Sequence, residues 1–213
     1  MIKVAFLFDK SNPWIFKKFK NNKNLFKKKI KYKFFFKYKK IKKYDLVVVL
    51  GNTKILPRKF VKDNQVFVTH GSFLPEYRGF APIQRQILDK KKIVGMTLFK
   101  ASPKLDSGPI VFQKKIKFSG LELYEEIREK QYLAQLGILE KLFSRYPKIK
   151  YKKQPEKKGK IFKKRKPEDQ KLDINKSIKE QFNLLRISNN NLWPAFFNYK
   201  KKKFIIKIYK NDK

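Results

Sequence analysis

The 213-residue sequence lacks cysteine entirely and contains one histidine, His70. The absence of cysteine excludes disulfides, thiolate metal sites and cysteine nucleophiles, and it is compatible with a reducing compartment. No apolar run is long enough for a membrane-spanning helix, and the short apolar run at the amino terminus does not match a signal peptide. We therefore expect a cytoplasmic protein that is not inserted in a membrane.

Glycine and arginine are also scarce, whereas lysine is abundant. The sequence contains 56 Lys and Arg residues and 17 Asp and Glu residues, which gives a formal net charge of +39. Only seven of the 56 basic residues are arginine. Such a charge usually indicates a nucleic-acid or anionic membrane partner. Because the lysines are spread along the chain and Phe, Ile and Asn are frequent too, an AT-rich genome composition explains most of the charge. We expect a solvated lysine coat that concentrates anionic substrates, and no nucleic-acid partner.

The apolar pattern predicts an α/β fold with a Rossmann-like open sheet that is mostly parallel. A loop containing Pro13 leads into a helix, residues 81–91 form a short helix, and one long amphipathic helix passes through residues 123–142 with Ser119 as its cap. Six runs have the length and composition of strands: residues 2–8, 32–36, 44–51, 65–70, 93–101 and 109–118.

The carboxyl-terminal third has a different composition. Residues 1–147 are predicted to form the catalytic domain, and residues 148–213 a Lys- and Pro-rich linker, a helix and a β-hairpin. The helix has Ile178, Phe182 and Leu185 on one face. The hairpin carries an apolar run from Phe204 to Ile208, which predicts pairing with a second copy and hence a homodimer.

Two residues are candidates for acid–base chemistry. His70 stands at the carboxyl end of the strand predicted at 65–70, and ligands of open α/β sheets bind at these strand ends. An imidazole can act as acid, base or charge stabiliser near neutrality. Asp106 falls in a turn between two strands, where an Asx cap is the alternative role, just as a structural loop histidine is the alternative for His70.

The segments around both residues resemble the formyltransferase family that uses 10-formyltetrahydrofolate, which includes glycinamide ribonucleotide formyltransferase, methionyl-tRNA formyltransferase and the sugar N-formyltransferases. The family pattern is Asn-x-His-x-Ser-Leu-Leu-Pro-x-Tyr-Arg-Gly followed by Leu-Asp-x-Gly-Pro-Ile. Residues 165–186 and 193–210 are similar to the carboxyl-terminal segment of the sugar-modifying members. The matching positions are His70, Ser72, Leu74, Pro75, Tyr77, Arg78, Gly79, Leu105, Asp106, Gly108, Pro109 and Ile110.

The resemblance implies that a substrate amine attacks the formyl carbon of the folate, with neither a metal nor a covalent enzyme intermediate. His70 stabilises the oxyanion or relays the proton, and Asp106 orients His70 and takes or shuttles that proton. The sequence departs from the pattern at Val68, where the family has a catalytic Asn. Asn52, Thr69 and Ser72 are candidates for the missing oxyanion donor.

Further site residues follow from the same resemblance. Backbone groups at Ile55 and Leu56 and in the segment 101–105, with Ser102, Pro103 and Leu105, correspond to the folate site, although core packing is an alternative for the first two. The predicted substrate contacts are Ser72, Arg78, Gly79 and Lys10, of which Arg78 is the better phosphate ligand because arginine is rare here. Trp193 and Phe196 stack on a base or pack the hairpin.

The predicted substrate is a 3-amino or 4-amino deoxysugar carried on a nucleoside diphosphate, formylated for surface polysaccharide synthesis such as lipopolysaccharide O-antigen. The carboxyl-terminal helix and hairpin favour this class. The sequence of segment 78–88 is also similar to that of methionyl-tRNA formyltransferases. Methionyl-tRNA therefore stays an alternative substrate. A second alternative is a catalytically impaired formyltransferase fold that binds nucleic acid or a protein partner.

Overall fold

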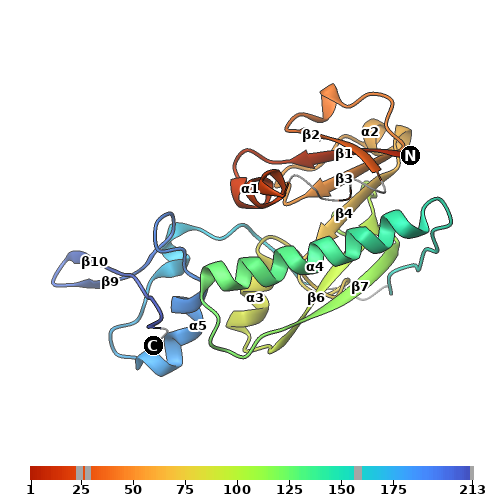
Figure 1. The fold of residues 1–213 in the computed structure, drawn as a ribbon. Coiled ribbons are helices and arrows are strands. Elements are labelled where there is room, and N and C mark those ends of the chain that lie inside the picture. Colours follow the sequence, from red (N-terminus) through yellow and green to blue (C-terminus); the bar gives the residue numbers. More distant parts are fainter. Residues whose placement is uncertain (23–25, 27–29, 156–159, 212–213) are drawn as a thin grey trace.

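The computed structural model describes residues 1–22, 26, 30–155 and 160–211. Its core is a six-stranded sheet in the order β2-β1-β3-β4-β6-β7 (Figure 1). The first four strands in that order are parallel, and the last two are antiparallel to their neighbours. This confirms the predicted mostly parallel α/β sheet. The strands are β1 (Ile2–Phe8), β2 (Ile30–Phe35), β3 (Leu46–Leu50), β4 (Val66–His70), β6 (Ile93–Lys100) and β7 (Ile110–Lys117).

Helices cover both faces of the sheet, which explains why its central strands are apolar throughout. All five residues of β3 are buried. One face packs against α1 (Pro13–Asn21) and α4 (Tyr124–Arg145), and the other face receives α2 (Arg58–Asp63). The short α3 (Pro82–Leu88) packs beside β6 and α5. Among the described residues, no helix combines the length and apolar character needed to cross a membrane.

The start of α4 differs from the prediction, because Ser119 is not its cap. The helix begins at Tyr124, and the Leu123 N–H donates to the Glu126 carboxylate at 2.8 Å. The Ser119 hydroxyl instead accepts from the Leu121 N–H at 3.1 Å in the preceding turn. In a capping box the acidic side chain at the third helical position accepts from the N–H of the cap residue, and Glu126 has this role here.

The chain leaves β1 toward β2 and returns to β3 on its other side, so the loops after β1 and β3 diverge and open a crevice. Asp9 fastens these loops together, since it accepts hydrogen bonds from the Ser11 N–H at 2.9 Å and from the Thr53 N–H at 3.1 Å. Burial raises the pKa of Asp9, but the hydrogen bonds from Thr53 and Ser11 outweigh it and lower the pKa to about 2.

The carboxyl-terminal segment contains the predicted helix, α5 (Ile178–Ile187), and the predicted hairpin of β9 (Ala195–Tyr199) and β10 (Lys202–Ile206). The predicted helix face is only partly correct, because Leu185 is buried whereas Ile178 is 73% exposed. Only the last turn of α5 is buried. There Arg186 donates to the Glu122 carbonyl at 3.0 Å and to its carboxylate at 3.3 Å.

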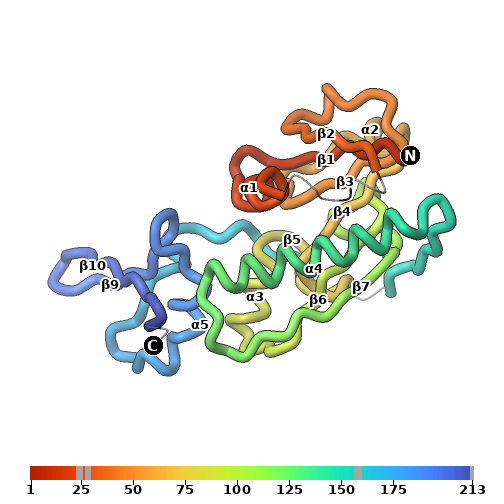
Figure 2. Tube along the Cα trace, viewed as in Figure 1, coloured from red at the N-terminus to blue at the C-terminus, as the bar shows by residue number. Residues whose placement is uncertain are grey.

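The segment predicted as a linker is hydrogen-bonded to the body of the protein. After α4 the chain pairs Lys152 with Ile110, and then returns past β5 (Figure 2). There β8 (Ile161–Phe162) pairs in parallel with β5 (Arg78–Gly79), in the loop that follows His70. Two short 3-10 helices, η1 (Tyr38–Lys40) and η2 (Pro167–Gln170), complete the described chain.

Candidate functional site

The fold brings His70 and Asp106 together, although β5, α3 and β6 lie between them in the sequence. His70 ends β4, and Asp106 lies in the turn between β6 and β7. Because β6 is antiparallel to β4, this turn starts beside the amino end of β4, where the Ala101 N–H donates to the Val66 carbonyl, and it then brings Asp106 back to His70. His70 Nδ1 lies 3.6 Å from Asp106 Oδ2, and the two side chains are only 8% and 11% exposed. We call these two residues, which the sequence predicts to be catalytic, the catalytic pair.

The proton position on His70 follows from its other nitrogen. His70 Nε2 lies 2.7 Å from the Tyr77 carbonyl oxygen, which can only accept a hydrogen bond. Nε2 therefore carries a hydrogen, and Nδ1 is the atom that gains or loses the exchangeable proton. Nδ1 faces Asp106, so a proton on this nitrogen points toward the carboxylate.

Asp106 is held by main-chain and buried polar groups. Its Oδ2 accepts from the Gly79 N–H at 2.8 Å, and its backbone has a φ of 46°, in the left-handed region. The Gln154 amide donates to the carbonyls of Asp106 at 3.0 Å and Gly108 at 2.7 Å. Arg78 in turn donates to Gln154 at 2.9 Å. This second layer positions the carboxylate before any substrate arrives.

A cleft of about 900 Å³ opens above the catalytic pair at the carboxyl ends of the strands. Its walls come from the strand ends, α4 and the carboxyl-terminal segment. Among the described residues, no cluster of His, Asp or Glu suitable for a metal ion is present. The cleft lining includes these predicted site residues: Asn52, Ile55, Leu56, Thr69, His70, Gly79, Ser102, Pro103, Leu105, Asp106 and Trp193.

One wall of the cleft is apolar and suits the flat ring system of a folate. Ile55 is 73% exposed, so core packing does not explain it, whereas the partly buried Leu56 also packs on the core beneath α2. Val68 lines the same cleft. Within the described chain, the N–H groups of Ser102 and Leu105 have no hydrogen-bond partner, which leaves them available to a ligand.

The candidate oxyanion donors differ in their availability. The Thr69 hydroxyl accepts from the Gln135 amide at 3.0 Å, so its own hydrogen remains available. The Asn52 amide donates to the Lys54 carbonyl at 2.8 Å. Ser72 is fully buried, donates to the Glu76 carbonyl at 2.6 Å and does not line the cleft.

Two more predicted substrate contacts, besides Ser72, lie outside the cleft lining. Arg78 is buried and points to Gln154, outside the cleft lining, so its placement supports Asp106 and does not favour a phosphate contact. Lys10 is exposed and also lies outside that lining. Phe196 is buried in the hairpin with the Lys203 ammonium 3.9 Å from its ring centroid, in agreement with a packing role.

The structure adds residues that the sequence did not single out. Arg128 of α4 lines the cleft with its guanidinium 4.5 Å from the Trp14 ring centroid and 5.0 Å from that of Tyr124. Gln135 of α4 contacts Thr69, and Lys164 and Arg165 line the cleft from the segment after β8. The local signal for the arginines was their rarity among so many lysines.

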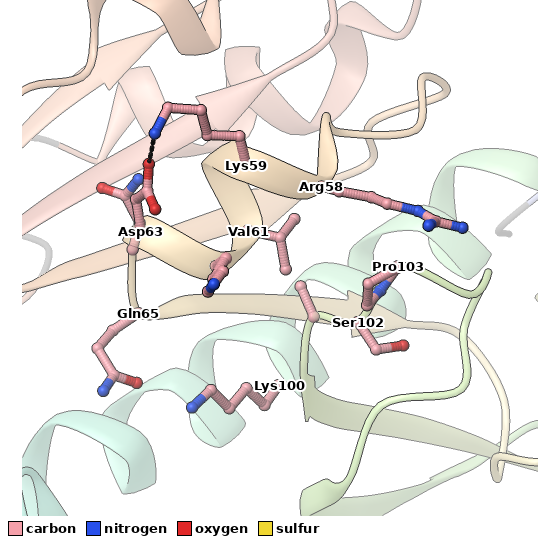
Figure 3. Close-up of a pocket in the computed structure, with 11 residues that line it drawn as sticks. Arg58, Lys59, Val61, Asp63, Gln65, Lys100, Ser102 and Pro103 are labelled. Carbon is pink, nitrogen blue, oxygen red and sulfur yellow. Dashed lines mark ion pairs between the residues drawn. The ribbon is translucent and has the colours of Figure 1, made fainter.

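A second hollow of about 630 Å³ lies between α2 and the segment that follows β6 (Figure 3). Its rim carries the ion pair between Lys59 and Asp63 at 3.1 Å. The hollow shares residues 101–103 with the cleft, but neither member of the catalytic pair lines it. The reactive groups therefore belong to the cleft alone.

Comparison with protein families identifies a match to the family described as "Formyl transferase" over residues 9–134, more than half of the chain. A methionyl-tRNA formyltransferase from Thermosipho melanesiensis is 37% identical over 95 residues, which cover 45% of this chain and 31% of that protein. The match thus spans about a third of this relative's length.

Solved structures share the fold. A methionyl-tRNA formyltransferase from Clostridium thermocellum has a TM-score of 0.78 at 22% identity, covering 100% of this chain and 96% of that one. A sugar N-formyltransferase from Shewanella has a TM-score of 0.73 at 19% identity, covering 98% and 97%. At these identities the likeness concerns the fold, and the matched region contains both members of the catalytic pair.

Proposed function

Because the chain belongs to the formyl transferase family, we propose that it moves a formyl group from 10-formyltetrahydrofolate to the amine of a sugar carried on a nucleoside diphosphate. The observation that carries this proposal is the catalytic pair, in which His70 Nδ1 faces the Asp106 carboxylate at 3.6 Å inside a cleft large enough for both substrates.

The folate fits the apolar wall of the cleft. Ile55 and Leu56 offer apolar surface, and the free N–H groups of Ser102 and Leu105 offer hydrogen bonds to polar ring atoms. A tetrahydrofolate-based donor is typical of the family and supplies the formyl carbon. The residues of this chain bind and orient the donor and keep the cleft floor buried.

The catalytic pair accepts the proton that the attacking amine loses. Gly79 holds Asp106 Oδ2, while Oδ1 has no partner among the described residues and is available to accept a hydrogen bond from that amine. The proton then resides on Asp106 or on His70 Nδ1, because the Tyr77 carbonyl keeps Nε2 protonated. Acid–base groups placed in this way contribute roughly 100- to 10,000-fold in rate.

In this proposal the Thr69 hydroxyl donates a hydrogen bond to the developing oxyanion. Val68 has no polar group at the family's Asn position, whereas the Thr69 hydroxyl lines the cleft and has a free hydrogen. Asn52 is less available because its amide donates to Lys54. Loss of one such donor typically costs roughly 100- to 1,000-fold in rate, so Thr69→Val is expected to be slow in turnover while its folate affinity stays unchanged.

A nucleotide-linked amino sugar suits the polar end of the cleft. Lys164 and Arg165 supply positive charge there, and Trp14 and Tyr124 supply aromatic surface beside Arg128. The likeness to the Shewanella sugar N-formyltransferase extends over 97% of that chain. A role in surface polysaccharide synthesis, a cytoplasmic location and a homodimer accompany this proposal as predictions.

Methionyl-tRNA is the second candidate acceptor. The Thermosipho and Clostridium proteins carry that name, and the net charge of +39 would attract RNA. The two candidates differ in the size and chemistry of the acceptor, so a single assay separates them.

The test measures formyl transfer from 10-formyltetrahydrofolate to a panel of nucleotide-linked 3-amino and 4-amino sugars and to methionyl-tRNA, with His70→Asn as the inactive control. Transfer to one sugar that disappears in the control supports the proposal. Transfer to methionyl-tRNA alone would replace the sugar by the second candidate. If no acceptor is formylated although folate still binds, the result would indicate a catalytically impaired formyltransferase fold.

A further inference from the structure

Two of the seven arginines of the chain lie near each other beside the cleft, which Arg165 lines and Arg85 does not. Arg85 belongs to α3 and Arg165 to the segment between β8 and η2. The guanidinium of Arg85 lies 5.4 Å from the centroid of the Phe162 ring, and the Lys163 carbonyl accepts from it at 3.4 Å. We call Arg85 and Arg165 the arginine pair.

The positive charges of the arginine pair are not compensated by the protein. Within the described ranges, no carboxylate forms an ion pair with either guanidinium. Burial and the charge of Arg85 lower the pKa of Arg165, and the charge of Asp169 opposes this shift. Two partly buried like charges repel each other, so the arrangement is unfavourable until an anion joins it.

The hydrogen bonds of the arginine pair go to neutral acceptors only. Arg165 donates to the Asp169 main-chain carbonyl at 2.7 Å and to Gln170 Oε1 at 2.8 Å. The Nε atoms of Arg85 and Arg165 are both buried and have no hydrogen-bond partner. The protein therefore fixes the position of the guanidinium groups and leaves donors on each of them unused.

The arginine pair is linked to the catalytic pair through the main chain. β8 places Phe162 beside Gly79, and the Phe80 N–H donates to the Phe162 carbonyl at 3.0 Å. The Gly79 N–H in turn holds Asp106. Arg165 and its neighbour Lys164 line the same cleft as His70 and Asp106. An anion at the arginine pair is thus part of a molecule that can reach the catalytic pair.

We propose that Arg85 and Arg165, with Lys164, form the subsite that binds the diphosphate of the acceptor substrate. This assignment rests on the proposed function and names the group by which the acceptor is held. Two adjacent guanidinium groups match two adjacent phosphates in charge, and the Nη1 hydrogens of each arginine have no partner among the described residues. A lone carboxylate would neutralise only one of them.

The first experiment measures binding and needs no turnover. Inorganic diphosphate and uridine diphosphate are titrated into the full chain by calorimetry at moderate salt, where contacts with the lysine coat weaken. Arg165→Gln and Arg85→Gln should each weaken binding about 10- to 100-fold, since each removes charge-assisted hydrogen bonds. The matched control is Lys163→Gln, which removes the same charge from an exposed neighbour outside the cleft lining and should leave binding unchanged.

Arg165 also supports its own loop through Asp169 and Gln170, so the fold of each variant is checked by its melting temperature without ligand. Arg85 makes one long hydrogen bond, and Arg85→Gln keeps the test valid if Arg165→Gln is unstable. Folded variants of both residues that bind diphosphate as well as the unaltered protein would overturn the subsite. Displacement of the probe by tRNA, with diphosphate binding unaffected by either variant, would assign the cleft edge to RNA instead.

Kinetics separates this inference from the function on which it rests. With an active amino sugar, both variants should raise the acceptor KM about 10- to 100-fold and leave the folate KM unchanged. An unchanged acceptor KM would reject the subsite while the transferase activity stands. Diphosphate binding that depends on Arg85 and Arg165 in a protein without transferase activity would retain the subsite and reject the proposed reaction.

Discussion

The catalytic pair and the arginine pair lie in one cleft but differ in how the protein satisfies them. His70 and Asp106 are complementary, and the Tyr77 carbonyl and the Gly79 N–H fix their outer atoms. The arginine pair consists of like charges, and no carboxylate among the described residues forms an ion pair with either of them. In the proposed mechanism, the groups that transfer the proton are thus positioned before the substrate arrives, whereas the groups proposed to bind the diphosphate still lack a counter-charge.

Removing the carboxylate of the catalytic pair should have the largest effect. Asp106→Asn preserves the shape of the side chain but cannot take a proton, so kcat/KM for formyl transfer should fall roughly 100- to 10,000-fold. Diphosphate affinity should be unchanged, because the arginine pair keeps its partners. Asp63→Asn, on the exposed α2, is the matched control for loss of one negative charge. A normal kcat/KM in Asp106→Asn would contradict the assigned role.

Loosening the carboxyl-terminal segment should affect the arginine pair more than the catalytic pair. Arg186 and Glu122 form an ion pair with side chains 2% and 6% exposed. Breaking a buried pair costs about 3–5 kcal/mol, so Arg186→Met should lower the free energy of unfolding by that amount in denaturant titrations.

Lys130 provides the control, because it binds the same carboxylate from a side chain that is 41% exposed. Lys130→Met should cost at most about 1 kcal/mol. Equal costs in the two variants would show that burial of the Arg186 contact is not what anchors α5. A selective loss of diphosphate affinity in Arg186→Met would show that the arginine pair depends on the anchoring of α5 more than the catalytic pair does.

Gly79 stands between the two pairs and tests their connection. Its φ is +92°, and a Cβ there would lie 2.3 Å from the Phe162 carbonyl oxygen. Gly79→Ala should cost about 1–3 kcal/mol of stability, lower kcat and raise the acceptor KM together. Gly120→Ala is matched in backbone strain, with φ +104° and no atom within 4 Å of the added Cβ. If both variants keep normal kinetics, β5 does not couple the pairs.

The smallest effect is expected at Asp9, on the far rim of the cleft. Its pKa in the folded protein is about 2, below the ordinary value of 3.8, so its stabilising hydrogen bonds are present above about pH 4 and lost as the pH falls toward 2. Asp9→Asn should flatten the acid side of a plot of melting temperature against pH. An acid side as steep as that of the unaltered protein would exclude Asp9 as its source.

Several errors of the sequence prediction have a common origin. Ser119 was expected to cap α4, but Glu126 satisfies that backbone. Ile178 and Leu185 were predicted on one face of a helix, but only the last turn of α5 meets the body of the protein. Both predictions assumed that a local pattern chooses its own partner. At α4 another side chain, that of Glu126, made the cap hydrogen bond, and at α5 no part of the body of the protein covers the first turns of the helix.

The sequence alone determined the six strands of the main sheet and the place of His70 at the carboxyl end of one of them, because apolar runs and turn residues act over a few positions. The antiparallel pairing of β6 with β4 and the path of the turn that brings Asp106 to His70 were decided by the tertiary structure. Only the tertiary structure decided which polar groups meet across long distances in the chain, such as Arg78 with Gln154 and Arg186 with Glu122. The arginine pair is of this kind. Arg85 and Arg165 come together because β8 returns to pair with β5. No local pattern in a lysine-rich segment distinguishes a solvated cation from a partly buried one that lies near another cation.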